Sequence, residues 1–255
     1  MRKNLTMHPL SGYAFLPGIA PYSSGVIAAA GYEIVHVTLA NPMPWHDGLR
    51  AAGSWLESRG LDRCDLCAVE LRCPAPHSPG GFAEFNGRYQ ALLEESKLLV
   101  DGQNPVARTN VAPLAKAPKE TQLFGFSFVQ SATTSIKTFV VAGAGELPHR
   151  DVDRRHIVRL GETSAEAMQD KAACVLLIIR KRLECLGVID SSTSMLNVYT
   201  EHPLQSILVD VIIPALPTAA HLGVRWFCSR PPVEEIEFEM DLRGVRQDLT
   251  VDLSH

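Results

Sequence analysis

Short stretches of this chain alternate hydrophobic with polar residues, and longer stretches between them repeat hydrophobic residues with helical spacing. Alternation with a period of two predicts a strand that buries one face, and it is clear over residues 65–73 and 236–242. In the second stretch Glu237, Glu239 and Asp241 occupy the polar positions, so we expect that strand to be half exposed to solvent. An apolar stripe with helical spacing predicts a helix between the two stretches, and it consists of Phe82, Phe85, Tyr89, Leu92 and Leu93.

The predicted elements occur in a similar order twice. The first series is strand, strand, helix, strand, helix, strand, strand at residues 25–30, 33–39, 45–58, 65–73, 82–96, 108–114 and 121–130. The second series is strand, helix, strand, helix, strand, strand at residues 138–142, 164–186, 194–199, 205–216, 224–229 and 236–242. Gly60 and Gly187 follow the first helix of each series, where glycine commonly ends a helix. Residues 249–255 form either a last strand or a loose tail. We therefore predict two domains, residues 1–132 and 133–255.

A repeated series of this kind predicts an α+β fold of two tandem units, each with a mostly antiparallel sheet and two helices packed on one face. The opposite face of each sheet also needs to be covered. The strand over 121–130 carries Phe124, Phe126 and Phe128, which are consistent with such a contact or with an internal core. Sheet faces of this kind often pack against equivalent units around a symmetry axis. We therefore expect a homo-oligomer.

The composition indicates a folded protein that binds neither nucleic acid nor membrane. Hydrophobic residues make up 46% of the 255 residues and charged residues 20%, which allows a buried core. The formal net charge of −4 provides no basic surface for nucleic-acid phosphates. The longest apolar run, residues 172–179, is far shorter than a membrane span. The amino-terminal residues lack the apolar run of a secretory signal, so we predict a cytoplasmic protein.

Two groups of possible metal ligands are better explained without a metal. Cys64, Cys67 and Cys73 begin like a zinc ribbon, but no second pair of ligands follows at the required spacing. Cys67 and Cys73 instead share one face of a predicted strand, which favours core packing. The second group is a polar cluster more typical of a solvated loop, at His149, Asp151, Asp153 and His156. We therefore predict no metal site.

One arginine is well placed to bind an anionic substrate. Arg108 follows Pro105 at the start of the extended segment 108–114. A planar guanidinium offers fixed donors that match a carboxylate bidentately, whereas a lysine does not. We therefore predict that Arg108 binds a carboxylate, the alternative being a surface ion pair with a neighbouring acidic residue. Arg225 is its counterpart in the second series.

Four segments of the first series carry a recognisable pattern in a fixed order. They are Pro-Tyr-Ser at residues 21–23, Val-Thr-Leu-Ala-Asn-Pro at 37–42, Phe-x-x-x-Asn-x-x-Tyr at 82–89 and Pro-Val-Ala-Arg at 105–108. In this order they resemble the Rid (YjgF-like) family of reactive-intermediate deaminases over roughly residues 12–130. The second series resembles the family more loosely, through Gly145, Pro148, Arg225 and the strand start at 235–237.

The resemblance implies ferredoxin-like, chorismate-mutase-like (YjgF-type) units that assemble as trimers, with pockets between neighbouring units. It also implies an enzyme that hydrolyses 2-imino or 2-enamino acids to 2-oxo acids and ammonia, without a metal or an organic cofactor. In that family an arginine holds the substrate carboxylate, a tyrosine and backbone groups line the pocket, and a glutamate helps to position water.

The resemblance assigns these roles to particular residues of this chain. Arg108 and Tyr22 take the places of the arginine and the tyrosine, and Thr38 takes that of a serine. The first series has no glutamate in the family's position, whereas Glu235 lies near it in the second series, so the pocket would join both halves. We predict Arg108, Tyr22 and Glu235 as catalytic residues. The predicted substrate-binding residues are Arg108, Thr38, Asn110 and Arg225.

The expected function is deamination of a small carboxylic acid. We expect hydrolysis of its enamine or imine, the acid being a 2-aminomuconate-like product of aromatic degradation or a 2-imino acid. Two alternatives remain open. The first is a lyase or hydrolase that acts on a cyclic carboxylate on the same scaffold. The second is a non-catalytic, carboxylate-binding oligomer.

Overall fold

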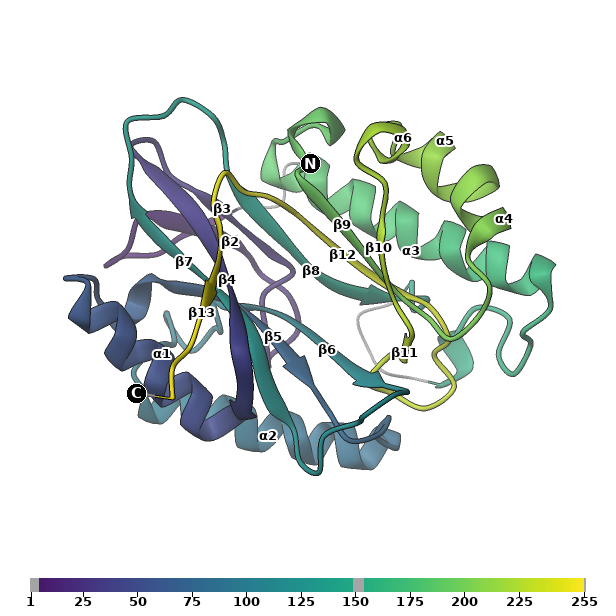
Figure 1. Ribbon diagram of the computed structural model, residues 1–255, viewed down its shortest axis with the longest axis horizontal. Helices are drawn as coiled ribbons and strands as arrows, with labels where there is room; N and C mark the ends of the chain where they lie inside the picture. The colour runs from purple at the N-terminus through teal and green to yellow at the C-terminus, as the bar shows by residue number, and fades with distance from the viewer. Residues whose placement is uncertain (1–4, 149–153, 255) are drawn as a thin grey trace.

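The computed structural model describes residues 5–148 and 154–254. Two β-sheets lie face to face, and helices cover the outer face of each sheet (Figure 1). Among the described residues, three large hydrophobic clusters lie between the layers, one between each sheet and its helices and one between the two sheets. A smaller fourth cluster contains Phe82 and Ile236. The α+β fold predicted from the sequence is therefore confirmed, with four layers in the order helix, sheet, sheet, helix.

The six-stranded sheet is built mainly from the first half of the chain. Its strands, in spatial order, are β11 (Ser229–Arg230), β6 (Ala107–Pro113), β5 (Leu66–Arg72), β7 (Gln122–Ser131), β4 (Tyr32–Pro44) and β13 (Asp248–Val251). Its outer face is covered by α1 (Trp45–Ser58) and α2 (Pro79–Glu95) (Figure 1). Trp45 and Phe85 from these helices pack in one cluster with Phe126 and Phe128 of β7.

The seven-stranded sheet combines the second half of the chain with an amino-terminal hairpin. Its strands are β1 (Thr6–Met7), β2 (Tyr13–Leu16), β3 (Gly25–Ala28), β8 (Phe139–Gly145), β12 (Glu239–Gly244), β9 (Met195–Tyr199) and β10 (Arg225–Phe227). The helices on its outer face are α3 (Ala165–Leu186), α4 (Gln205–Ile207), α5 (Ile213–Ala215) and α6 (Ala219–Leu222). Short 3₁₀ turns lie at Arg63–Asp65, Arg154–His156 and Asp190–Ser192.

Most helix ends follow local sequence signals. The side chains of Ser78 and Ser164 accept backbone N–H groups at the starts of α2 and α3. Gly187 ends α3 with a φ of 69°, a left-handed conformation that glycine adopts readily. The helix predicted over 205–216 is interrupted by a π-helical turn at Leu208–Ile212. Pro214 follows this turn and has no N–H for a regular helical bond, which explains the interruption.

The two sheets contain the same four-strand arrangement, which is consistent with the predicted repeat. The order β6-β5-β7-β4 in one sheet matches β10-β9-β12-β8 in the other. In both sets the first two strands are parallel and the remaining neighbours antiparallel. The chain order through these strands is also the same, so each half contributes one copy of the unit.

Each half also contributes strands to the other half's sheet. Strand β3 precedes β4 in the chain but pairs with β8, through Gly25 and Val141 among others. Strand β13 follows β12 but pairs in parallel with β4, through Leu249 and Val37 among others, as the yellow strand beside β4 in Figure 1 shows. The carboxyl-terminal segment thus contains a strand at its start. The division into domains 1–132 and 133–255 stays a prediction.

The inner faces of the two sheets cover each other. Tyr13, Phe15 and Val140 of one sheet pack in a single cluster with Ile34 and Val129 of the other. The sequence led us to expect these faces to pack against other copies, but the second half of the same chain covers them. Of the three phenylalanines of β7 that we weighed for that contact, Phe126 and Phe128 face the helices instead.

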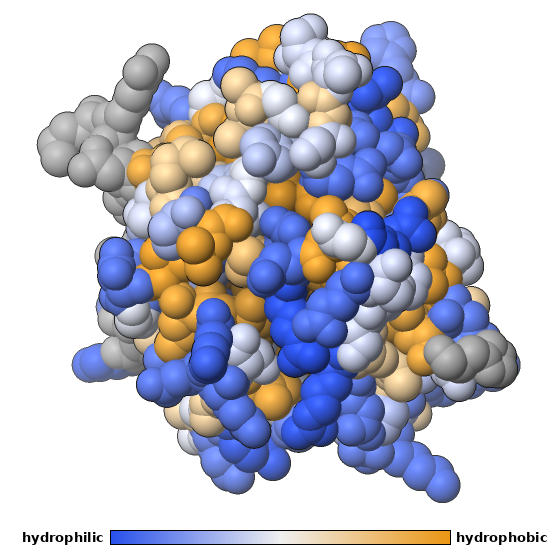
Figure 2. Space-filling view, turned by 90° about the vertical axis from the view of Figure 1, so that its left-hand side faces the viewer, coloured by the Kyte–Doolittle hydropathy of each residue, from blue (hydrophilic) through white to orange (hydrophobic). Residues whose placement is uncertain are grey.

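The surface carries hydrophobic and hydrophilic residues in mixed areas. On the face shown in Figure 2, hydrophilic residues form a band between hydrophobic areas. Among the described residues, no helix is both long and apolar enough to cross a membrane. The cytoplasmic location stays a prediction.

Candidate active site

A cavity of about 370 Å³ lies between the two halves of the chain. The first half lines it with β6, the start of α2 and the segment 16–24, and the second half lines it with β8, β12, α3 and the segment 232–236. Small-molecule sites in proteins typically measure roughly 300–1,000 Å³. The cavity is therefore large enough for a small molecule, and both halves of the chain contribute to its lining.

Arg108 of β6 is held in this cavity by the motif noted on α2. Its Nη2 donates to Oδ1 of Asn86 at 2.6 Å. Its guanidinium carbon lies 4.6 Å from the ring centres of both Tyr89 and Tyr22, which is a cation–π arrangement. The residues that orient Arg108 thus come from a helix and from a distant loop, so the fold sets the direction of this side chain.

Arg108 carries a buried charge that the described residues do not balance with an ion pair. The residue is 3% exposed, and its Nη1 has no hydrogen-bond partner in the described part of the chain. Burial lowers the pKa of Arg108 from its ordinary value, but a guanidinium remains protonated in proteins. A buried charge without a partner is costly. This arrangement is suited to an anionic ligand that supplies the missing partner.

Two further predicted residues lie beside Arg108. Asn110 follows on the same face of β6, and neither its Oδ1 nor its Nδ2 has a hydrogen-bond partner among the described residues. Tyr22 lines the cavity as well, and burial raises the pKa of its hydroxyl, so the group stays protonated at neutral pH. The structure therefore brings Arg108, Asn110 and Tyr22 together. Their roles in binding and catalysis stay predictions.

Glu239 of β12 carries the one carboxyl group among the described residues that line this cavity. Burial raises the pKa of Glu239 well above its usual range, and the neighbouring Asp241 raises it further. The cavity therefore favours the protonated form of Glu239, which can donate a proton. Its carboxyl occupies the space beside Gly143 of β8, where any side chain would collide with it.

Helix α3 adds two cations to the opposite half of the lining. Arg182 is half-buried, and its Nη1 donates to the carbonyl oxygens of Ala142 and Gly143 at 2.7 and 3.1 Å. Lys181 is exposed and lines the same cavity. Ile178, Lys181, Arg182 and Cys185 line it together because their spacing places them on one face of the helix. The sequence prediction missed both cations, although this helical spacing is a signal that could have found them.

Three predicted site residues do not line the cavity. Thr38 pairs with Gly125 and Thr250 within the six-stranded sheet. Glu235 lies in the loop before β12 with a φ of 70°, and it does not reach the lining that Glu239 reaches four residues later. Arg225 is 55% exposed at its side chain and lies 4.0 Å from Asp248. The available carboxyl group is thus Glu239 rather than Glu235.

The register of β10 explains why Arg225 is not the structural counterpart of Arg108. Arg225 of β10 pairs with Asn197 of β9. The next residue of β9, Val198, packs toward the helices, so Asn197 faces the other sheet, and Arg225 faces the same way. Arg108 lies on the helix-facing side of its strand, where it contacts α2. A shift of one residue exchanges the faces of a strand. The helix-facing position of β10 is therefore taken by Trp226, and the second half lacks a matching arginine there.

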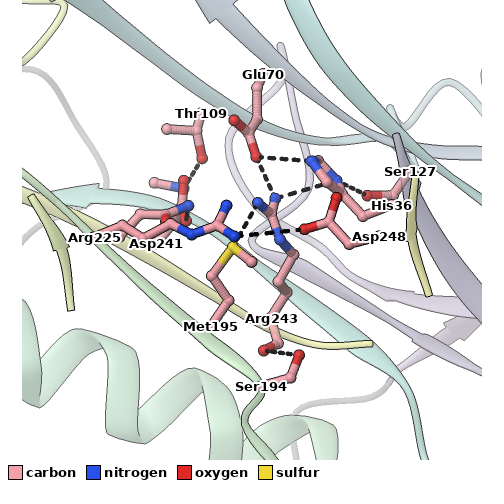
Figure 3. A network of polar contacts seen from close by, with 12 residues as sticks. His36, Glu70, Thr109, Ser127, Ser194, Met195, Arg225, Asp241, Arg243 and Asp248 are labelled. Atoms are coloured by element: carbon pink, nitrogen blue, oxygen red, sulfur yellow. Dashed lines mark hydrogen bonds and ion pairs between the residues drawn. The ribbon is translucent and has the colours of Figure 1, made fainter. Parts of the chain in front are cut away.

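A second polar group lies between the two sheets (Figure 3). Arg243 of β12 donates to Glu70 of β5 and contacts Nδ1 of His36 on β4 at 3.1 Å. His36 also contacts Ser127 at 3.0 Å. On the same strand as Arg243, Asp241 accepts hydrogen bonds from Asn197 and Tyr199. These contacts join strands of both sheets.

This inter-sheet group is a structural link rather than a second ligand site. The space beside it measures about 10 Å³, whereas a single water needs roughly 10–15 Å³. Burial and then the charge of Arg243 lower the pKa of His36 to about 3, so this imidazole is neutral. Burial and then the charge of Glu70 raise the pKa of Asp241 to about 6. The charges therefore interact with one another and leave no room for a ligand.

A third polar group could in principle hold a metal ion. Ligand atoms of Glu201, His202 and Glu237 lie within 4.8 Å of one another. Arg230, however, lies 3.3 Å from Glu201 and 3.5 Å from Glu237. Its positive charge already compensates these carboxylates, so the group is explained as a salt-bridge network. Of the cluster noted in the sequence, His149, Asp151 and Asp153 lie outside the described residues.

Comparison with known proteins places this geometry in a family context. The family model described as 2-aminomuconate deaminase CnbZ matches residues 5–249. The chain is 32% identical over 240 residues to 2-amino-5-chloromuconate deaminase of Comamonas testosteroni, covering 91% of this chain and 93% of that protein.

Solved structures with some likeness include a chorismatase and proteins of the YjgF type. The chorismatase matches with a TM-score of 0.45 at 14% identity, over 87% of this chain and 77% of that one. The YjgF gene product of E. coli matches with a TM-score of 0.29 at 17% identity, over 53% of this chain and 94% of that one.

Proposed function

Because the chain belongs to the 2-aminomuconate deaminase family, we propose that it hydrolyses a 2-aminomuconate-like acid to the 2-oxo acid and ammonia. The observation that carries the proposal is Arg108, a buried guanidinium in the cavity with no ion pair among the described residues. The substrate in question has a carboxylate next to the carbon that bears the amino group. This carboxylate is the partner that Arg108 would take.

In this proposal, the first half of the chain binds and orients the substrate. Arg108 holds the carboxylate, Asn110 offers a donor and an acceptor beside it, and Tyr22 covers the guanidinium. Fixing the carboxylate also fixes the adjacent carbon, at which water must add. Orientation of this kind can supply several kcal/mol, up to roughly 7–11, of the reduction in barrier.

The second half supplies the proton-transfer group, Glu239. The enamine first takes a proton from Glu239 on carbon and becomes the iminium ion, which leaves Glu239 ionised. Water then adds to the carbon of the C=N bond as the ionised Glu239 accepts a proton from that water. Glu239, protonated again, gives this proton to the nitrogen of the carbinolamine. As the C–N bond breaks and ammonia leaves, the hydroxyl proton returns to Glu239 and the C=O bond forms. General acid–base catalysis typically contributes about 100- to 10,000-fold to a rate.

Replacing Arg108 tests the proposal directly. We expect Arg108→Met to lower kcat/KM for ammonia release from 2-aminomuconate by about 100-fold, because the charged hydrogen bonds lost are together worth roughly 3 kcal/mol. Arg225→Met is the matched variant, since this exposed arginine lies outside the cavity. The measurement is enzyme-coupled detection of ammonia.

Three outcomes would contradict parts of this proposal. Unchanged turnover in Arg108→Met would remove the role of Arg108. A loss in Arg225→Met alone would favour the second-half arginine that the sequence suggested. Binding of carboxylic acids without turnover, seen as a rise in Tm, would support the carboxylate-binding oligomer instead of an enzyme.

We also propose that the protein is a homo-oligomer, a trimer or a multiple of it, as the family resemblance implies. Support for an oligomer comes from large apolar side chains at the surface, among them Leu177, Val209 and Trp226. The cavity itself is lined by residues of a single chain. The mass of the protein in solution, measured by light scattering, tests the assembly independently of activity.

A further inference from the structure

A buried ion pair lies directly beside the lining of the cavity. Its acid is Glu146, which follows β8 between two residues that line the cavity, Gly145 and Leu147. Its cation is Lys171 of α3, whose Nζ donates to Oε1 of Glu146 at 3.1 Å and to the carbonyl oxygen of Val158 at 2.9 Å. Both side chains of the pair are fully buried. A buried ion pair is on its own weak evidence for stability, and the contacts of Glu146 with the backbone point to a further role.

The side chain of Glu146 continues the pairing between β8 and β12. Backbone pairing of the two strands ends where Glu239 lies opposite Gly145. Beyond that point the N–H groups of Glu237 and Phe238 need other acceptors. They donate to Oε1 and Oε2 of Glu146 at 2.7 and 3.0 Å. The carboxyl of Glu146 thus holds the two residues that directly precede Glu239.

The contacts of Glu146 suit an ionised carboxylate. Among the described residues, its side-chain partners are the ammonium of Lys171 and the two N–H groups, and all three are donors. Burial raises the pKa of Glu146, and the charge of Lys171 and the N–H of Glu237 oppose that rise. An ionised carboxylate accepts from all three donors, whereas a protonated one would turn its O–H toward one of them. Each donor thus favours the ionised form.

The hold on residues 237–238 sets the direction of the Glu239 side chain. Phe238 is fully buried in the cluster between the seven-stranded sheet and its helices. Successive residues of a strand point to opposite faces, so Glu239 points away from that cluster, and it lines the cavity. There its carboxyl fills the space beside Gly143. A shift of the start of β12 would therefore move the carboxyl out of this space.

Glu146 also acts on Glu239 through its charge. Burial raises the pKa of Glu239, and the carboxylates of Asp241 and Glu146 raise it further, whereas the guanidinium groups of Arg182 and Arg108 lower it. These four neighbours come from β12, the end of β8, α3 and β6. Loss of the Glu146 carboxylate would therefore remove a hydrogen-bond support and a neighbouring charge at the same time.

We propose that Glu146 is a positioning residue for Glu239, because it holds the backbone of residues 237–238 and thereby keeps the carboxyl of Glu239 beside Gly143 in the cavity. Lys171 in turn keeps Glu146 in place. This inference rests on the proposed function, since Glu239 is the proton-transfer group there. Neither Glu146 nor Lys171 lines the cavity, so both act through Glu239 and not on the substrate.

Glu146→Gln tests the proposal through activity. An amide places an NH2 group where one carboxylate oxygen was, so one of the two N–H groups loses its acceptor. We expect kcat for ammonia release from 2-aminomuconate to fall by about 10- to 100-fold, because a displacement on the order of 1 Å can cost 100-fold. KM should change by less than about threefold, since Arg108 binds the substrate independently of Glu146. A raised KM with an unchanged kcat would overturn the inference.

The pH profile gives a readout that a purely structural role would not move. Burial, Asp241 and Glu146 raise the pKa of Glu239, and Glu146→Gln removes the last of these contributions. The protonated form of Glu239 is then lost at a lower pH. The alkaline limb of kcat should therefore move to lower pH in Glu146→Gln, and an unmoved limb would overturn the inference.

Two further variants separate positioning from stability. Glu33→Gln is the matched control, because Glu33 is also a buried carboxylate with an ion pair, to Arg246 at 3.4 Å, and lies outside the cavity lining. It should leave kcat and the alkaline limb unchanged, and the same changes in this control would count against the inference. Glu146→Gln combined with Lys171→Met leaves no cation of this pair buried without a partner, so it should recover stability but not kcat. Recovery of kcat together with stability would show a structural role alone. The double variant also carries the test if Glu146→Gln by itself does not fold.

A measurement without turnover separates this inference from the proposed function. The full-length protein is labelled with carbon-13 at the glutamate carboxyl groups, and Glu239→Gln identifies the NMR signal of Glu239. We expect the titration of this signal to move to lower pH in Glu146→Gln and to stay unchanged in Glu33→Gln. A native protein that shows this shift but releases no ammonia from 2-aminomuconate retains the positioning role and loses the deaminase proposal. A native protein that deaminates 2-aminomuconate but shows no shift in Glu146→Gln loses the positioning role alone.

Discussion

At the scale of single residues, the cavity combines a guanidinium that keeps its charge with a carboxyl whose protonated form is favoured. Both groups are buried, and burial disfavours the charged form of each. Arg108 nevertheless keeps its charge, because a guanidinium stays protonated in proteins. For Glu239 the shift favours the protonated carboxyl. The same environment thus prepares one group to bind an anion and the other to donate a proton.

The role of Glu239 leads to a prediction about pH. Because the pKa of Glu239 is raised, the protonated form persists to a higher pH than in an ordinary glutamic acid and is lost as the pH rises through the raised pKa. We expect kcat to fall on the alkaline side for this reason. Glu239→Gln should lower kcat by about 100-fold or more and should remove that alkaline limb. The measurement is the pH profile of ammonia release.

Glu235→Gln is the comparison for this prediction, since Glu235 lies outside the cavity lining. If Glu235→Gln abolished turnover and Glu239→Gln did not, the glutamate suggested by the sequence would be the correct one. A stability measurement on both variants shows whether either loss comes from unfolding.

The sequence could identify some of these residues and not others. Arg108, Asn86 and Tyr89 belong to a motif with fixed spacing, so their association was predictable. Glu239 was not, because its strand alternates like one that is half exposed, whereas the structure buries both faces of β12. Its acidic side is covered by the other sheet. Which surface covers a strand depends on contacts between distant segments, and alternation does not encode these.

At the scale of elements, the exchange of strands joins the two halves of the chain. Strand β13 pairs with the edge of β4, and its residues are alternately exposed and half-buried. Leu249 and Val251 pack against the cluster beneath α1 and α2. Thr250 lies between them and is exposed. The contribution of this strand to stability should therefore depend on two side chains.

Shortening those side chains tests the contribution of β13. We expect Leu249→Ala combined with Val251→Ala to lower the free energy of unfolding by about 1–3 kcal/mol, since both side chains are partly buried. Thr250→Ala should change it by less than about 0.5 kcal/mol. Urea unfolding followed by circular dichroism measures both values. Equal effects of the two changes would mean that β13 stabilises the protein through its backbone pairing alone.

Local sequence signals predict the helices and strands more reliably than they predict which strands pair with each other. The predicted helix over 45–58 coincides with α1, because glycine and a regular apolar stripe define its end and its face. Strand β2 was missed, since Tyr13–Leu16 is continuously apolar and does not alternate. The pairing of β3 with β8 could not be predicted either. A strand's sequence fixes its buried face but leaves open which sheet it joins.

At the scale of the whole molecule, the interface between the sheets contains charges as well as apolar side chains. Burial raises the pKa of Glu70, but the adjacent Arg243, followed by His36 and Arg72, lowers it to about 2. Glu70 is therefore ionised in the folded protein. Arg243 is 4% exposed and depends on this carboxylate for compensation (Figure 3). The two halves are thus held in register by a buried ion pair.

Removing one partner of this pair should be strongly destabilising. We expect Glu70→Gln to lower the free energy of unfolding by roughly 3–5 kcal/mol, because it leaves the guanidinium of Arg243 buried without full compensation. Glu57→Gln removes the exposed pair with Arg63 and should cost at most about 1 kcal/mol. A carboxyl with a lowered pKa stabilises the fold above its unfolded pKa, roughly 4.3. The difference between the native protein and Glu70→Gln should therefore be full at neutral pH and shrink as the pH falls from about 4 toward 2. Urea unfolding at several pH values measures it, and a difference that stayed constant over this range would show that the charge of Glu70 does not join the halves.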